Sequence, residues 1–239
     1  MPNEEANQAV RVGVLTPHSS LGPEEEFPAM ARVVTCVARI GADDVAVEPV
    51  LDQAAVLFER GSVDVLGFAS TSSAYALGFD AEQKLVSRLS RQLGIPAAAT
   101  SASAVLALHV LGVERVALVH PPWFDAELND LGTAYFESQG VDVVSAASAS
   151  LSRDPSKIEA AAVCDWTASH VGPEAEGVFI GGNGFRAAGA VEALEARIGR
   201  PVLTSNQVLL WKLLAQAGAT EPIDGYGRVF SHTPQPAGR

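Results

Sequence analysis

The sequence of 239 residues has few cysteines, few cations and no long apolar run. Lys and Arg number 16 against 28 Asp and Glu, and the net charge of −12 argues against nucleic acid or an anionic membrane as a partner. The apolar segment 97–111 is interrupted by polar side chains, so we expect no membrane span. The first ten residues lack the basic start and apolar stretch of a secretory signal, and the expected location is the cytoplasm.

The two cysteines, Cys36 and Cys164, lie far apart in segments with a helical pattern. We expect both to be buried, inert thiols, because neither has the paired spacing of a disulfide or a metal site. The sequence also lacks a P-loop, a G-x-S-x-G nucleophile elbow and an acidic metal cluster. Any chemistry is therefore expected to proceed without a metal or another cofactor.

Short runs rich in β-formers alternate with longer segments of helical period, which indicates an α/β fold with parallel sheets. The predicted strands cover 12–15, 45–48, 63–68, 97–99, 116–119, 141–145, 178–180 and 202–204. The predicted helices cover 26–40, 52–60, 81–93, 103–111, 125–139, 154–170, 185–198 and 207–217.

The chain contains an internal repeat. "VRVGVLTPH" matches "VERVALVHPP" with Val12 aligned to Val116, an offset of 104 (116 − 12), and "GIPAAATSAS" matches "GRPVLTSNQ" at nearly the same offset. The repeat predicts two pseudo-symmetric Rossmann-like lobes with parallel sheets, at residues 11–111 and 112–239, the second including a C-terminal tail.

Two polar loops follow predicted strands in different lobes. "ASTSS", residues 69–73, places hydroxyl groups beside the free amides of a helix start, which suits either a carboxylate or simple helix capping. "GGNG", residues 181–184, departs from the G-x-G-x-x-G spacing of dinucleotide sites, and we interpret it as a tight turn or as an amide site for an anion. Since ligands of open α/β sheets bind beyond the carboxyl ends of the strands, we expect both loops to line one cleft.

Three further side chains lie near predicted strand ends. His18 and His120 could shuttle protons near neutral pH, or could be ordinary solvated or hydrogen-bonded residues. Trp123 could form an apolar wall with an indole N–H donor, or could pack in the core.

The chain resembles the aspartate/glutamate racemase superfamily over most of residues 11–230, and within it the branch of arylmalonate decarboxylase and maleate cis-trans isomerase. The resemblance rests on the two-lobe pattern and on "TPHSS", "ASTSSAYALG", "GVFIGGNGFRAAGAVEALEARIGRPVLTSNQ" and "GYGRVF". In that family each lobe can contribute a cysteine to the cleft. Racemases use both as acid and base, the isomerase uses the first as nucleophile, and the decarboxylase keeps the second as proton donor. Here the matching positions hold Ser70 and Gly182, so both thiols are missing.

The resemblance also implies a set of binding residues. Thr71 and Ser72 match a carboxylate cradle, and the turn after the second-lobe strand matches an oxyanion site. Trp123 stands where members often have tyrosine, and Ser20 stands near an asparagine of the isomerase. The implied substrate-binding residues are Ser20, Thr71, Ser72, Trp123, Gly182, Asn183 and Gly184.

These observations predict a cofactor-independent enzyme that acts on a small malonate- or maleate-type acid through an oxyanion or enediolate, as a decarboxylase, isomerase or lyase. Ser70, His18 or His120 would move the proton. The alternatives are a hydrolase or hydratase that uses Ser70 or a His-activated water, and a non-catalytic carboxylate-binding protein. A homodimer is consistent with the resemblance.

Overall fold

The computed structural model describes residues 9–17, 21–41, 48–58, 61–219 and 221–234. Its strands are β1 (Val10–Thr16), β2 (Val33–Arg39), β3 (Val65–Phe68), β4 (Ala97–Ala99), β5 (Arg115–His120), β6 (Asp142–Ser148), β7 (Gly177–Ile180) and β8 (Val202–Thr204). Its α-helices are α1 (Pro23–Met30), α2 (Glu48–Ala55), α3 (Thr71–Leu77), α4 (Phe79–Leu93), α5 (Thr100–Val110), α6 (Ala126–Glu137), α7 (Ala160–His170), α8 (Val191–Ile198) and α9 (Ser205–Gln216). Short 3₁₀ turns are η3 (Pro155–Lys157), η4 (Asn183–Phe185), η5 (Ala188–Ala190) and η6 (Arg228–Ser231).

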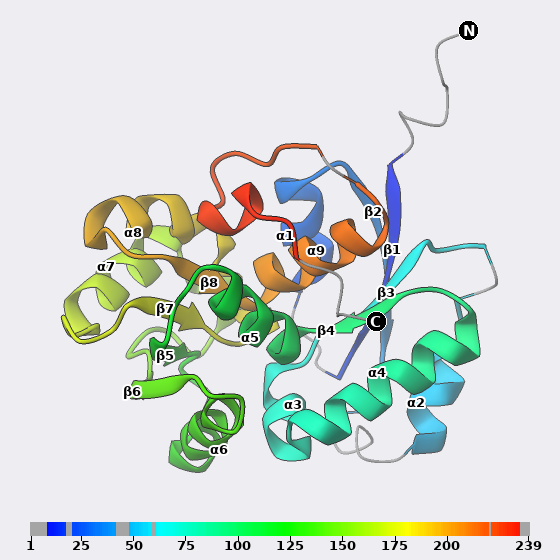
Figure 1. The fold of residues 1–239 in the computed structure, drawn as a ribbon, viewed down its shortest axis with the longest axis horizontal. Helices are drawn as coiled ribbons and strands as arrows, with labels where there is room; N and C mark the ends of the chain where they lie inside the picture. The colour runs from blue at the N-terminus through cyan, green and yellow to red at the C-terminus, as the bar shows by residue number, and fades with distance from the viewer. Residues whose placement is uncertain (1–8, 18–20, 42–47, 59–60, 220, 235–239) are drawn as a thin grey trace, which may run out of the picture.

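The strands form two four-stranded parallel sheets that lie beside each other (Figure 1). The order is β2-β1-β3-β4 in the first sheet and β6-β5-β7-β8 in the second, so the two have the same topology. Val12 and Val14 of β1 are fully buried, as expected for a parallel strand that pairs on both sides and is covered on both faces. The predicted α/β class with two related parallel sheets is confirmed.

The last helix of each half packs against the sheet of the other half. Helix α5 places Ala104, Val105 and Leu108 in one core cluster with residues of the second sheet. Helix α9 places Leu209 and Leu213 against the first sheet. Figure 1 shows both helices in the middle of the molecule. The packing therefore crosses the boundary between residues 111 and 112, and the division into lobes at that point stays a proposal.

A glycine on β3 makes the close packing of α9 possible. A Cβ at Gly67 would lie 3.0 Å from Leu213 Cδ1 and 3.2 Å from Leu209 Cδ2. We expect Leu213→Ala to lower the free energy of unfolding by about 2–5 kcal/mol, because Leu213 is fully buried, and Gly67→Ala to lower it by about 1–3 kcal/mol. In the double variant the new methyl group enters the vacated space, so urea denaturation should show a smaller loss than the two single losses combined. Strict additivity, to within about 0.5 kcal/mol, would contradict this packing.

The helix predicted over 26–40 is wrong. Helix α1 ends at Met30, and 33–39 form β2 at the edge of the first sheet. The run "VVTCVA" is rich in β-branched residues, which favour strands, and the edge position exposes alternate side chains, which hides the apolar signal of a buried strand. Cys36 is therefore exposed on β2, contrary to expectation, whereas Cys164 is buried.

The strand predicted over 45–48 falls on residues 45–47, which lie outside the described residues, and on Glu48, which begins α2. The helix predicted over 185–198 begins only at Val191, because two 3₁₀ turns precede it. Within the described ranges, no helix combines the length and apolar character that crossing a membrane requires.

Candidate functional site

A cavity of about 220 Å³ lies beyond the carboxyl ends of β3, β5 and β7, where loops from both halves meet. Pockets for drug-sized ligands are typically about 300–1,000 Å³, so this cavity suits a small molecule. Its lining residues are Ser70, Thr71, Ser72, Trp123, Phe124, Leu128, Gly182, Asn183 and Gly184. The structure thus brings together seven of the residues that the sequence predicted for the site. His18 and Ser20 lie outside the described residues.

Ser70 caps helix α3. Its extended backbone, with φ −153° and ψ 103°, ends the strand segment, and its Oγ accepts a hydrogen bond from Ser73 N at 3.3 Å. The Ser70 hydroxyl donates to Ser73 Oγ at 2.6 Å. Ser70 therefore has the capping role considered for this loop, and it also lines the cavity.

Thr71 connects the two halves at the site. It is 2% exposed, and its Oγ1 accepts a hydrogen bond from Gly182 N at 3.0 Å. The same oxygen shares a hydrogen bond with Ser205 Oγ at 2.9 Å. The hydroxyl loop and the glycine-rich turn, which are more than a hundred residues apart in sequence, are therefore held at hydrogen-bond distance.

The glycine-rich turn is a 3₁₀ turn rather than the start of an α-helix. Gly182 has φ +91°, a conformation that favours glycine, and its carbonyl accepts from Phe185 N at 2.9 Å. The Asn183 side chain points into the buried network, because Nδ2 donates to Thr100 Oγ1 at 3.1 Å and to Asn206 Oδ1 at 2.8 Å. The turn therefore offers main-chain groups to the cavity.

A buried carboxyl supports this turn from behind. Glu26 accepts from Asn206 Nδ2 at 2.6 Å and from Ala188 N at 2.8 Å, and Asn206 also donates to the Asn183 carbonyl at 2.8 Å. Burial raises the pKa of Glu26 to about 7, although these hydrogen bonds oppose the shift. Sequence reasoning did not assign Glu26 to the site, since contacts between distant segments leave no local signal.

His120 is fully buried behind the cavity and does not line it. Its Nε2 lies 3.1 Å from Tyr75 Oη and its Nδ1 lies 2.6 Å from Asn129 Oδ1. Burial lowers the pKa of His120 to about 4, so the ring is neutral near pH 7. A ring with a proton on Nδ1 donates to Asn129 and accepts from Tyr75, which satisfies both nitrogens. The proton-shuttle role predicted for His120 stays a prediction.

Aromatic and aliphatic side chains form the remaining wall. Trp123 packs edge to face on Phe185, with ring centroids 6.0 Å apart. Phe124 and Leu128 also line the cavity, and neither was predicted, because both lie in a segment without a motif. Trp123 thus lines the cavity, and its contact with a ligand stays a prediction.

The described lining residues are all uncharged, and none is acidic or basic. Nor do the described residues contain a group of three or more His, Cys, Asp or Glu side chains that could hold a metal ion. Negative oxygen in this cavity would be stabilised by hydroxyl and amide dipoles, which act strongly where water is excluded.

Paired parallel α/β halves with a small polar cavity where their loops meet are the arrangement expected of a protein of the aspartate/glutamate racemase type. The sequence agrees, because the family model described as arylmalonate decarboxylase matches residues 12–230. The chain belongs to this family, and the resemblance inferred from its motifs is confirmed.

Two curated relatives match nearly the whole chain. An arylmalonate decarboxylase from Bordetella bronchiseptica is 25% identical over 218 residues, which is 89% of each chain. A maleate isomerase from Pseudomonas putida is 24% identical, over 94% of this chain and 98% of the relative.

Solved structures show the same fold. A crystal structure of arylmalonate decarboxylase superposes with a TM-score of 0.82 at 21% identity, over 92% of this chain and 99% of that one. The maleate cis-trans isomerase of Nocardia farcinica, carrying a covalently bound succinylcysteine, gives 0.81 at 18% identity, over 96% and 100%.

Cysteines introduced at Ser70 and Gly182 should face one space. In a Cys36→Ser background, we expect dibromobimane, a short bifunctional alkylating agent, to bridge the Ser70→Cys, Gly182→Cys pair, as measured by mass spectrometry. The Gly182→Cys change should cost about 1–3 kcal/mol in urea denaturation, because φ is +91° and a Cβ would lie 2.9 Å from Pro121 Cγ. Each single variant serves as control. Separate alkylation of the two thiols without a bridge would show that the positions do not share the cavity.

Proposed function

We propose that this chain is a cofactor-independent enzyme that acts on a small malonate- or maleate-type carboxylic acid through an oxyanion or enediolate, without a catalytic cysteine. One observation carries the proposal. Hydroxyl groups of one half and main-chain groups of the other line a single small cavity, and none of its described lining residues is charged. The names of the two curated relatives support the same substrate class. The cytoplasm is the proposed location, with a homodimer as the candidate assembly.

The hydroxyl loop is assigned to the substrate carboxylate. Thr71 and Ser72 begin α3, where the first main-chain N–H groups of a helix have no intrahelical acceptor. Their amides and hydroxyls can donate to one carboxylate of the substrate. The main-chain amides of Asn183 and Gly184 are assigned to the second oxygen centre, on which charge develops.

Decarboxylation illustrates how this arrangement works. The C–C bond to one carboxyl group breaks, CO₂ leaves, and the electron pair passes to the remaining carboxyl group as an enediolate, which then takes a proton at carbon. One oxyanion donor contributes about 10²–10³-fold to the rate, and a positioned acid or base about 10²–10⁴-fold. Donors alone therefore sustain measurable turnover. We assign the proton transfer to Ser70, His18 or His120, of which Ser70 lines the cavity.

The proposal is tested with a panel of substituted malonates, maleate and small amides in D₂O, followed by NMR. The expected result is conversion of a malonate to CO₂ and a monocarboxylic acid that carries deuterium at the α-carbon, or conversion of maleate to fumarate. Amide cleavage or hydration of maleate would instead support the hydrolase or hydratase.

A carboxylate-binding protein is the second candidate, because no described lining residue is an ordinary acid or base. Ligand at about 100 times Kd should then stabilise the fold by about 2.7 kcal/mol, seen as a raised Tm. A raised Tm with no compound consumed would favour binding over catalysis.

A further inference from the structure

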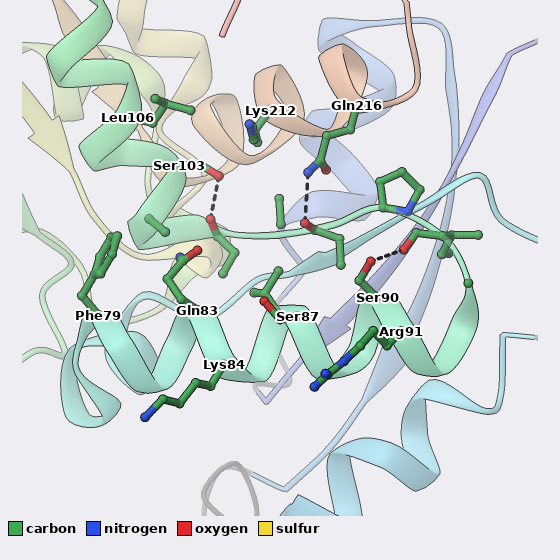
Figure 2. Close-up of a pocket in the computed structure, with 18 residues that line it drawn as sticks. Phe79, Gln83, Lys84, Ser87, Ser90, Arg91, Ser103, Leu106, Lys212 and Gln216 are labelled. Atoms are coloured by element: carbon green, nitrogen blue, oxygen red, sulfur yellow. Dashed lines mark hydrogen bonds between the residues drawn. The ribbon is translucent and has the colours of Figure 1, made fainter. Parts of the chain in front are cut away.

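A second cavity lies apart from the one beyond the carboxyl ends of β3, β5 and β7, which we call the reaction cavity. It is a groove of about 1080 Å³ along β4, an edge strand of the first sheet. Figure 2 shows that α4 forms one wall and that α5 and α9 form the other, with β4 between them. We call it the β4 groove. It shares no lining residue with the reaction cavity.

The β4 groove is not built to take up another strand. The carbonyl of Ala97 accepts from Gln216 Nε2 at 3.1 Å, and the carbonyl of Ala99 accepts from Ser103 Oγ at 2.6 Å. Figure 2 shows both contacts between the helix wall and β4. Since strand addition requires free main-chain groups, these side chains disfavour a docked peptide strand.

The charge in the β4 groove is opposite to that of the whole protein. Two of the three lysines of the chain, Lys84 and Lys212, line it together with Arg91, whereas the net charge is −12. None of the described lining residues is acidic, and none of these three cations forms an ion pair within the described part of the chain. Positive charge has therefore gathered in one groove without a counter-ion among the residues that the structure describes.

Lys212 is the cation best placed to bind. Its side chain is half-buried on α9 and, in Figure 2, lies between Ser103 and Gln216 on the wall opposite α4. Burial lowers the pKa of the Lys212 ammonium, which shows that holding this charge here costs free energy. Lys84 and Arg91 are exposed on α4 and lie at the rim.

Apolar surface continues from Lys212 along the groove. Ala98 and Ala99 of β4 line the groove, and Ala102 and Leu106 of α5 and Phe79 of α4 add further apolar lining. A ligand that matches this lining has an anionic head group and an apolar body.

We propose that the β4 groove is a second ligand site, which binds an amphiphilic carboxylate. Lys212 binds the carboxylate head group, the apolar chain lies along the alanines of β4 and Leu106, and Lys84 with Arg91 attracts the anion from the rim. The site does not depend on the proposed reaction, and it takes a longer and more apolar acid than a cavity of about 220 Å³ accommodates.

The probe is decanoate, titrated calorimetrically into the full chain, with decanol as the uncharged molecule of equal chain length. We expect saturable binding of one decanoate per chain and at least about tenfold weaker binding of decanol, since a hydrogen bond to a charged group is worth roughly that factor. Lys212→Met should weaken decanoate binding about tenfold and leave decanol binding unchanged. Lys212→Arg, which keeps the charge, should retain most of the affinity.

Lys157→Met is the matched control, because Lys157 is an exposed lysine on η3 that pairs with Asp154 away from the groove. It should leave decanoate binding unchanged, as should Thr71→Val in the reaction cavity. Neutralising the rim with Lys84→Gln and Arg91→Gln should cost about twofold per residue and reduce the salt dependence.

Several results would overturn the proposal. Equal affinity for decanol, unchanged binding in folded Lys212→Met, or loss of binding in folded Thr71→Val would each do so. So would binding to anionic phospholipid vesicles in place of free decanoate, or a sedimentation experiment in which Lys212→Met dissociates a dimer that covers the groove. Turnover of malonates or maleate is not a readout here, so failure of this proposal and failure of the proposed function are distinguishable.

Discussion

Thr71→Val is expected to reduce kcat/KM for the substrate found in the malonate and maleate panel by about 10²–10³-fold, mainly through kcat. Valine keeps the shape of the side chain but removes the hydroxyl that accepts from Gly182 N and shares a hydrogen bond with Ser205. The loss therefore affects a proposed substrate donor and also the bond that fixes the glycine-rich turn. Steady-state kinetics with the purified variant measures the effect.

The matched control is Thr71→Ser, which keeps the hydroxyl and should retain activity to within about tenfold. Because an unpaired buried amide costs about 1–3 kcal/mol, urea denaturation must show that Thr71→Val is still folded under assay conditions. A folded Thr71→Val enzyme with undiminished kcat would remove Thr71 from the proposed carboxylate site.

The stability of the protein is expected to fall as the pH rises from about 4.5 to about 7. Burial raises the pKa of both Glu26 and Glu82 to about 7, from an ordinary value of 4.5. A carboxyl group whose pKa is raised in the folded state gives stability that is fully present below its unfolded pKa. That stability is lost as the pH rises through the folded pKa. For each of the two groups this change corresponds to a loss of about 3 kcal/mol of stability.

His120 makes the protein more stable as the pH rises, and so opposes the two glutamates over part of this range. Burial lowers its pKa from 6.5 to about 4, so its contribution is present above about pH 6.5 and is lost as the pH falls through about 4. Between about pH 4.5 and 6.5 the histidine therefore offsets one of the two glutamates. The decline should be steepest near about pH 6–6.5, because the offset from His120 fades as the pH approaches 6.5, whereas the loss from the glutamates fades only as it approaches 7.

The variant Glu26→Gln isolates the contribution of Glu26 to the pH dependence of stability. Glutamine resembles the protonated carboxyl group, so the stability difference between wild type and Glu26→Gln should shift by up to about 3 kcal/mol between about pH 5 and pH 8, in favour of the variant at high pH. Glu137→Gln, which removes one exposed carboxylate from α6, is the control for net charge. Parallel pH profiles of wild type and Glu26→Gln would show that Glu26 does not bind a proton on folding in this range.

The sequence predicted much of the fold and most of the cavity, because the signals were local. Buried parallel strands appear as short apolar runs, and small polar residues directly follow β3 and β7. Since the carboxyl ends of parallel strands converge, Thr71 and Gly182 could be placed in one cleft without any knowledge of their contacts. The structure gives the same juxtaposition through the bond from Gly182 N to Thr71 Oγ1.

What the sequence did not predict depends on contacts between distant segments. The buried Glu26 touches Asn206 across 180 positions, and no local pattern marks such a pair. The burial of His120 was not predicted. Its partners Tyr75 and Asn129 lie on α3 and α6, and only the packing of these helices brings them to the histidine. Strand β2 was read as a helix because edge strands expose alternate side chains.

Because α5 and α9 each pack against the sheet of the other half, the two halves cannot separate freely. A hinge opening of the kind used by two-domain binding proteins would pull Leu209 and Leu213 away from the first sheet and expose them to water, and the same motion would uncover the second sheet beneath α5. Access to the cavity therefore depends on its surface loops, while the scaffold beneath stays fixed. Donors mounted on such a scaffold are aligned before the substrate arrives and need no reorganisation as charge develops on it.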